Sequence, residues 1–183
     1  MIYEMNLLKI IDNIGFHGPL LMSIITISQI WRKSYYLVGY ILGLFVNKIL
    51  NEFLKETIKG PRPEPINLLK EQKRDIFNFL HTQQTKETYI PKAHIYGMPS
   101  GHAQTAGYSL GFLYCVNGIT PLWYGVATLN GIVFFQRWYD NKHTILQLCV
   151  GGIIGFIFAF CIYTITKKIV KKHLFEMTTS KNK

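Results

Sequence analysis

Two histidines and several fixed cations lie where they could bind and cleave a phosphorylated compound. The string GMPSGH at residues 97–102 opens directly into the apolar segment 103–116. If that segment is a helix, its first turn presents backbone N–H groups and the positive end of the helix dipole to an anion. Ser100 adds a hydroxyl donor, Gly101 adds a backbone N–H, and His102 adds an imidazole that can donate a proton. The string therefore predicts a phosphate site.

Two other segments carry residues that would complete this site. Lys55 is followed after six residues by Arg62, and Arg137 is followed after five residues by His143. Each pattern alone is short, and a lone histidine at a helix start is more often a cap or a satisfied polar residue. The three patterns occur in this order, each at the edge of a hydrophobic segment, and together they favour one shared site.

The composition indicates a membrane protein. The 183 residues are 49% hydrophobic and only 16% charged, which is too apolar for an ordinary soluble domain of this length. The formal charge of +10 lies in loops and in the tail, without interleaved aromatic residues along one face, so nucleic acid is excluded as a partner. Lysines at the membrane surface and an anionic substrate explain the charge better. The cysteines lie in apolar stretches and are interpreted as small core residues, neither disulfides nor metal ligands: Cys115, Cys149 and Cys161.

We expect an all-α integral membrane protein, a single domain over residues 1–183 with about five transmembrane helices. A helix needs roughly 20 apolar residues to cross a bilayer core. The segment that ends at Ile165 is the clearest span, and its glycines at 151, 152 and 155 permit close helix packing. The five predicted spans are Ile14–Trp31, Tyr35–Leu54, Ala103–Val116, Leu122–Phe135 and Thr144–Ile165.

Three segments are expected outside the spans. Residues 1–13 carry charges among apolar residues, which favours an amphipathic segment at the membrane surface over a cleavable signal peptide. Residues 55–98 form an extramembrane loop, in which residues 66–80 are either an amphipathic surface helix or lid, or a plain linker. Residues 166–183 form a basic tail that is expected to bind an anionic leaflet.

Polar residues in the last third of the second span have two interpretations. Asn47, Lys48, Asn51 and Glu52 recur at helical spacing. In the first interpretation they face the bundle interior or a wet cavity, because charge that faces lipid is costly. In the second, they belong to a helix end that already lies among the lipid headgroups. The residues alone leave both interpretations open.

Five spans place all three motifs on one side of the membrane. The first motif follows span two, the second opens span three, and the third lies between spans four and five. Arg32, Lys33 and the lysine-rich tail share the opposite side, which the positive-inside rule assigns to the cytoplasm. The expected site is therefore extracytoplasmic or lumenal.

The three motifs resemble the signatures of the type-2 phosphatidic acid phosphatase superfamily of membrane lipid phosphatases. Those signatures are Lys-six-residues-Arg-Pro, Pro-Ser-Gly-His and Ser-Arg-five-residues-His-three-residues-Asp. The resemblance implies that His143 is the nucleophile and that His102 protonates the leaving oxygen. It further implies a phosphohistidine intermediate and no metal or cofactor. The phosphate would be bound by Lys55, Arg62, Ser100, Gly101 and Arg137.

Two glutamines depart from these signatures. Gln147 stands in place of the superfamily's Asp and would orient the imidazole through its amide oxygen, while Gln136 stands in place of the Ser. The segments 143–147 and 96–104 resemble one branch, the dolichyl-diphosphate phosphatases, in which Gln takes the place of the Asp. Gln136 and the insert at residues 65–92 depart even from that branch, which leaves the lid and the substrate range open.

The branch implies hydrolysis of a polyprenyl diphosphate to the monophosphate and phosphate. In a eukaryotic cell it implies the endoplasmic reticulum and recycling of the glycosylation lipid carrier. The implied partners are the lipid diphosphate substrate and membrane lipids. The alternatives are a broader phosphatidate or lipid monophosphate phosphatase, and an inactive lipid-phosphate-binding membrane scaffold, which the two glutamines motivate.

Overall fold

The computed structural model describes residues 2–63 and 95–181, and every regular element in these ranges is a helix. The expected all-α fold is confirmed. The segment 66–80 and most of the insert at 65–92 lie outside the described residues. The helices are α1 (Ile2–Ile30), α2 (Ser34–Ile58), α5 (Gly101–Asn117), α6 (Pro121–Tyr139) and α7 (Ile145–Lys181).

Three of these helices are long and apolar enough to cross a membrane: Leu7–Ile30, Ser34–Ile58 and Ile145–Ser180. Helices α5 and α6 have 17 and 19 residues, or about 26 and 28 Å at 1.5 Å per residue. Five complete spans therefore remain a prediction.

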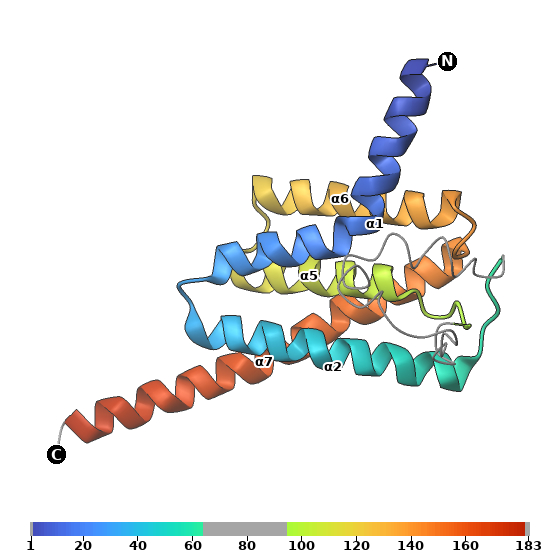
Figure 1. Cartoon of the computed structure of the whole chain (residues 1–183). Helices are drawn as coiled ribbons and strands as arrows, with labels where there is room; N and C mark the ends of the chain where they lie inside the picture. Colours follow the sequence, from blue (N-terminus) through green and yellow to red (C-terminus); the bar gives the residue numbers. More distant parts are fainter. Residues whose placement is uncertain (1, 64–94, 182–183) are drawn as a thin grey trace, which may run out of the picture.

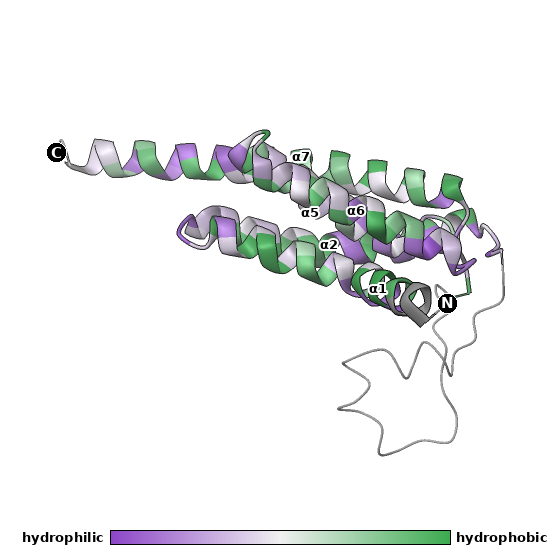
Figure 2. Ribbon diagram, turned by 90° about the horizontal axis from the view of Figure 1, so that it is seen from above, coloured by the Kyte–Doolittle hydropathy of each residue, from purple (hydrophilic) through white to green (hydrophobic). Residues whose placement is uncertain are grey.

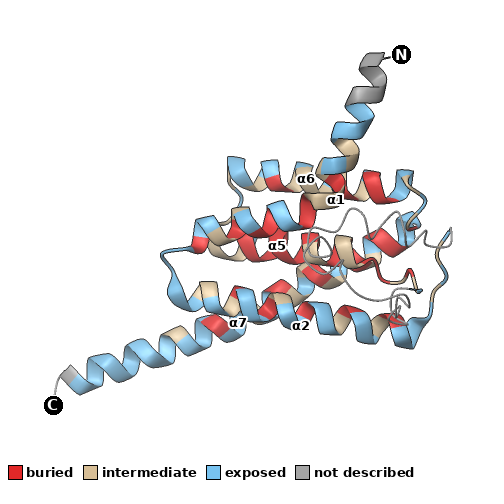
Figure 3. Ribbon diagram, viewed as in Figure 1, coloured by how far each residue is buried: buried red, intermediate tan, exposed pale blue. Residues whose placement is uncertain are grey.

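Helix α5 forms the centre of the bundle. It contacts each of the other four helices, and most residues of its first three turns are buried (Figures 1 and 3). A helix that is buried on all sides loses its amphipathic pattern, because every face meets protein. Tyr108 and Phe112 of α5 pack with Tyr40 of α2 in the core. The first turn of α5 is thereby fixed relative to all the other helices.

Helices α5 and α7 approach closely because small residues face each other. A Cβ atom at Gly155 would overlap the carbonyl oxygen of Gln104, and one at Gly107 would overlap that of Gly152. A Cβ atom at Gly151 would lie 2.6 Å from the carbonyl oxygen of Ser100. The expectation that glycines permit close packing of this span is thus confirmed, and the contact positions the GMPSGH string against the start of α7.

Replacing Gly155 by alanine is expected to destabilise the protein by about 1–3 kcal/mol, because the new methyl group meets backbone atoms that cannot rotate away. Gly125→Ala in α6 is the matched control, since a Cβ atom there has no neighbour within 4 Å. Thermal unfolding in detergent measures both. An equal melting temperature for the two variants would contradict the close packing.

The ends of the chain extend from the bundle as helix. Residues 2–13 are continuous with the rest of α1, so the predicted surface segment and the first span belong to one helix, and the location of the first turns at the membrane surface stays a prediction. Pro19 lies inside α1, whose first turns run out of the bundle (Figure 1). Helix α7 is about 55 Å long, and its last turns project beyond the bundle at the opposite end, with more hydrophilic residues than the part within the bundle (Figures 1 and 2).

Helices α2 and α6 end later in the sequence than the predicted spans, at Ile58 and Tyr139. Lys55 lies in the last turn of α2 and Arg137 in the last turn of α6, rather than in loops. Of the four polar residues of α2, Asn47 and Asn51 are buried in the bundle, which confirms the interior interpretation for them, whereas Lys48 and Glu52 are exposed. The interpretation of the cysteines as core residues is wrong for two of them, because the side chains are exposed on the outer face of α7: Cys149 and Cys161.

Candidate active site

The structure brings the three motif segments together at one end of the bundle, as the order of the spans predicts. The backbone N–H of Gly97 donates to the carbonyl of Gly60 at 2.8 Å, which joins the second motif to the first. Arg62 donates to the carbonyl of Lys142 at 3.4 Å, which joins the first to the third. The N–H of Ser100 donates to the carbonyl of Gln147 at 3.1 Å, which joins the second to the third.

Gln147 lies where these segments meet and belongs to a capping box at the start of α7. Its N–H donates to the Thr144 hydroxyl at 3.2 Å, and its Oε1 accepts from the Thr144 N–H at 3.1 Å. Its Nε2 donates to the carbonyl of Pro61 at 2.7 Å. The pattern Thr-x-x-Gln is visible in the sequence and could have predicted this cap. The amide of Gln147 thus bonds the start of α7 through its oxygen and the first motif segment through its nitrogen.

The imidazole of His143 is buried, and one of its nitrogens is fully engaged. Nδ1 lies 2.9 Å from the carbonyl oxygen of Gly97 and 3.3 Å from Oε1 of Gln147. Both neighbours are hydrogen-bond acceptors, so Nδ1 carries the proton and Nε2 holds the lone pair. Burial, and after it the charges of Arg62, Arg137 and Lys55, lower the pKa of His143 to about 2. The ring is therefore neutral, and its Nε2 lone pair is available.

Gly97 has no room for a side chain. A Cβ atom there would lie 2.8 Å from Oε1 and 2.9 Å from Nε2 of Gln147, and 3.0 Å from Cγ of Arg62. The backbone of residue 97 thus passes between the first and third motifs and presents its carbonyl to His143. Gly97 belongs to the GMPSGH string, but nothing in the sequence indicates this contact.

The first turn of α5 presents His102 to the same site. Ser100 is the N-cap residue, whose hydroxyl oxygen accepts from the Ala103 N–H at 3.4 Å, and the hydroxyl proton can still donate. The N–H of Gly101 belongs to the first turn, where a helix supplies no acceptor. Burial, followed by the charges of Arg137, His143, Lys55 and Arg62, lowers the pKa of His102 well below its usual value.

The three predicted cations converge on the two histidines. Lys55 and Arg137 are buried, with relative exposures of 9% and 4%, and Arg62 is half-buried. The carbonyl of Arg137 accepts from the N–H of Lys142 at 3.0 Å and from that of His143 at 3.2 Å. The turn between α6 and α7 therefore fixes Arg137 and His143 relative to each other.

A cluster of side-chain amides lies between α2 and α5, next to the turn of α2 that carries Lys55. This cluster was not predicted from the sequence. Gln104 donates to the Asn47 side chain at 2.9 Å and accepts from Asn51 at 2.8 Å, and Asn51 also donates to the carbonyl of Pro99 at 3.3 Å. The signal for it is the spacing of Asn47, Asn51 and Lys55, each four residues apart on one face of α2. The cluster holds the turn before α5 next to the helix that carries Lys55.

The arrangement can bind and transfer a phosphoryl group. Three fixed positive charges and the first turn of a helix suit the oxygens of a phosphate. One imidazole has a fixed tautomer and an available lone pair, while the second stands at the helix start. The predicted site residues are thus brought to one end of the bundle, and their individual roles remain predictions.

Comparisons with known proteins identify the family of the chain. The family model of the PAP2 superfamily matches residues 36–171, which is well over half of the chain. Dolichyldiphosphatase 1 of Mus musculus is 26% identical over 157 residues, and the protein of the same name from Rhinolophus ferrumequinum is 26% identical over 161 residues. Each alignment covers 77% of this chain, and the chain spans 57% of the length of either relative.

A solved structure supports the fold. The first transmembrane PAP2 type phosphatidylglycerolphosphate phosphatase from Bacillus subtilis superposes with a TM-score of 0.55 at 17% sequence identity. The match covers 89% of this chain and 78% of that one. Together with the family match and the three motif segments that meet at one end of the bundle, this similarity shows that the chain belongs to the PAP2 superfamily.

Proposed function

We propose that this protein is a membrane lipid phosphatase that hydrolyses a polyprenyl diphosphate, of the dolichyl type, to the monophosphate and inorganic phosphate. The observation that carries the proposal is His143, a buried neutral imidazole whose Nδ1 proton is held by two acceptors while three cations surround the ring. The substrate class is supported by Gln147 and by the relatives named dolichyldiphosphatase 1.

In the first step, Nε2 of His143 attacks the terminal phosphorus in line. An N–P bond forms, and the bond from phosphorus to the bridging oxygen breaks. His102 gives its proton to the departing prenyl monophosphate, a contribution of typically about 10² to 10⁴ in rate. Burial, and after it the neighbouring cations, lower the pKa of His102; the negative charge of the bound phosphate acts against both effects, so we expect the imidazole to take up this proton when substrate binds.

In the second step, His102 removes a proton from a water molecule. The water oxygen attacks phosphorus, the N–P bond breaks, and inorganic phosphate leaves. Lys55, Arg62 and Arg137 bind the non-bridging oxygens in both steps, where they stabilise the dispersed charge of the transition state. The arginines can bind in a bidentate manner, which a lysine cannot. Ser100 and the N–H of Gly101 add neutral donors. The protein supplies all these charges itself, so the proposed reaction needs no metal.

The proposed site faces the extracytoplasmic or lumenal side. The turn at Arg32 and Lys33 and the basic end of α7 lie at the end of the bundle opposite to the motif segments (Figure 1). Basic residues favour the cytoplasmic side of a membrane, which leaves the site on the other side. In a eukaryotic cell the proposed location is the endoplasmic reticulum.

Purified protein in detergent is expected to release phosphate from a polyprenyl diphosphate at the same rate with and without a chelator, because the bound charges come from side chains. Phosphatidate in the same detergent is expected to turn over more slowly. Faster release from phosphatidate would favour the broader lipid phosphatase. Lipid-phosphate binding without release, even at high protein concentration, would show a scaffold, and loss of activity with chelator would contradict the metal-free mechanism.

A further inference from the structure

Helix α1 lies outside the residues that match the family, yet it packs on the site. The family match begins at residue 36, after α1 has ended. A Cβ atom at Gly15 would overlap Cβ of Gln136, and one at Gly18 would overlap a methyl group of Val133. The backbone of α1 therefore contacts the last turns of α6, the segment that carries Arg137.

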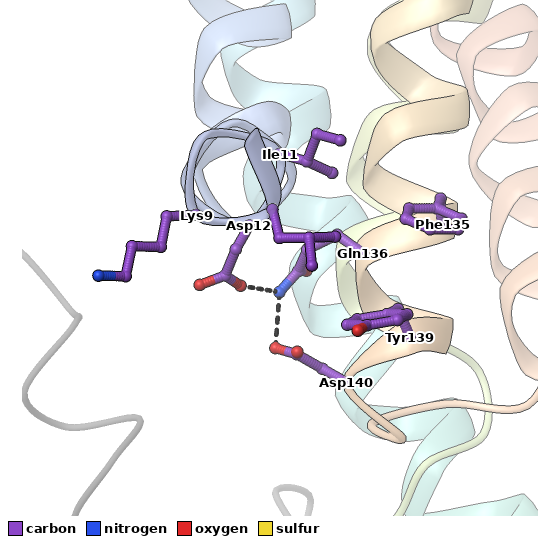
Figure 4. Close-up of a pocket in the computed structure, with 8 residues that line it drawn as sticks. Lys9, Ile11, Asp12, Phe135, Gln136, Tyr139 and Asp140 are labelled. Atoms are coloured by element: carbon purple, nitrogen blue, oxygen red, sulfur yellow. Dashed lines mark hydrogen bonds between the residues drawn. The ribbon is translucent and has the colours of Figure 1, made fainter. Parts of the chain in front are cut away.

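An amide bridges two carboxylates at this contact. Nε2 of Gln136 donates to Oδ1 of Asp12 on α1 and to Oδ2 of Asp140, each at 2.8 Å (Figure 4). Gln136 is buried, with a relative exposure of 2%. The three side chains line a hollow of about 200 Å³ between α1 and α6. Gln136 directly precedes Arg137, and Asp140 begins the turn that leads to His143, so the bridge links α1 to the last turn of α6 and to the start of this turn.

The other side of the site also contacts α1. The ring of Phe16, one helical turn after Asp12, lies 5.8 Å from the ring of His102, centroid to centroid, with the planes inclined by 48°. An aromatic ring beside an imidazole restricts its rotation and excludes water from that face. Helix α1 thus contacts the immediate neighbour of one proposed phosphate ligand and the proposed proton donor itself.

We infer that Asp12 and Phe16 are positioning residues of the active site, and that Gln136 is the residue through which α1 acts on Arg137. The three family motifs define three sides of the site, and α1 supplies a fourth. A serine at position 136, as in the family signature, is too short to reach both carboxylates from the same backbone. The Gln in this chain therefore adds a connection to α1. The inference rests on the proposed function.

The test compares variants of Asp12 and Gln136. Asp12→Ala and Gln136→Ser are each expected to lower kcat/KM by about tenfold, because loss of the bridge lets Arg137 move from its productive position. The affinity for inorganic phosphate, measured by calorimetry on the detergent-solubilised protein, is expected to fall with it. Asp12→Asn keeps an acceptor oxygen and is expected to retain most of the activity. The matched control is Asn13→Ala, an exposed neighbour on the same helix.

Phe16→Ala acts on His102, so it is expected to lower kcat while the affinity for inorganic phosphate stays the same. The double variant Asp12→Ala, Gln136→Ser is expected to be no worse than Gln136→Ser alone, because that single variant already lacks the bond to Asp12. The inference is overturned if both single variants keep kcat/KM within twofold of wild type, if Asn13→Ala is equally impaired, or if the two losses multiply.

A failure of the proposed function has a different signature. In that case the wild-type protein releases no phosphate from the prenyl diphosphate. The affinity for inorganic phosphate can still be compared between wild type, Asp12→Ala and Gln136→Ser, because this measurement does not depend on the identity of the lipid substrate. Weaker binding in these two variants supports the positioning role, and equal binding overturns it.

Discussion

Replacement of His143 by alanine is expected to lower phosphate release from a polyprenyl diphosphate by about 10⁴-fold or more, because in the proposed mechanism this residue forms the covalent bond to phosphorus. The ring is held in one tautomer: Nδ1 is bonded to the carbonyl of Gly97 and to Gln147, and Nε2 keeps the lone pair. No other group of the site has a fixed tautomer of this kind among the described residues. Release is measured by a phosphate assay with purified protein.

The control for this prediction is His173→Ala, which removes an exposed histidine from the projecting end of α7 and is expected to retain full activity. Equal melting temperatures separate lost chemistry from lost folding. Wild type incubated with a labelled substrate and quenched in alkali is expected to carry an acid-labile phosphoryl group that is absent from His143→Ala. Full release by the alanine variant would exclude His143 as the nucleophile.

The meeting of the three motifs is predictable from sequence because it depends only on the order of apolar segments. An even number of crossings separates the first motif from the third, so both must lie at one end of an up-and-down bundle. The residue types then suggest an anion site with two bases. The hydrogen bonds between motifs are not predictable in this way, because they depend on the loops.

Helix ends are less predictable than helix existence. Hydropathy places the end of a span where apolar residues cease, but Lys55 and Arg137 continue their helices because their carbonyls find N–H partners in the following turn. Asn47 and Lys48 are adjacent polar residues, and the sequence pattern does not distinguish which of them is buried. Only the direction of α2 relative to α5 decides that the first is buried and the second exposed.

Contacts across long sequence separations are the least predictable part of the site. Nothing near Asp12 indicates that its carboxylate bonds to Gln136, which is 124 residues away. For Cys149 and Cys161 the sequence instead suggests burial that the structure does not show. Their apolar surroundings suggest a protein core, but the outer face of a membrane helix has the same composition as its inner face.

Gln147→Asp, which installs the superfamily's usual residue, is expected to lower kcat/KM by about 10²-fold rather than to raise it, because misplaced reacting groups cost that much. The aspartate is one carbon shorter and has no donor for the carbonyl of Pro61, which accepts from the amide at 2.7 Å. The first-motif loop, and Arg62 with it, loses this anchor. Melting temperature and kcat/KM are measured together.

Gln147→Glu separates the two halves of the amide's role. Glutamate keeps the length, the capping box with Thr144 and an acceptor for Nδ1 of His143, and loses only the donor to Pro61. We expect activity in the order Gln, Glu, Asp, with the Glu variant reduced about tenfold, mainly through a higher KM, because Arg62 binds the phosphate less well. If the carboxylate's charge mattered more than this donor, both acidic variants would exceed wild type. Higher activity of the acidic variants would show that Gln147 lowers activity relative to a carboxylate. The expected order would show that the bond from the amide to the carbonyl of Pro61 is required for full activity.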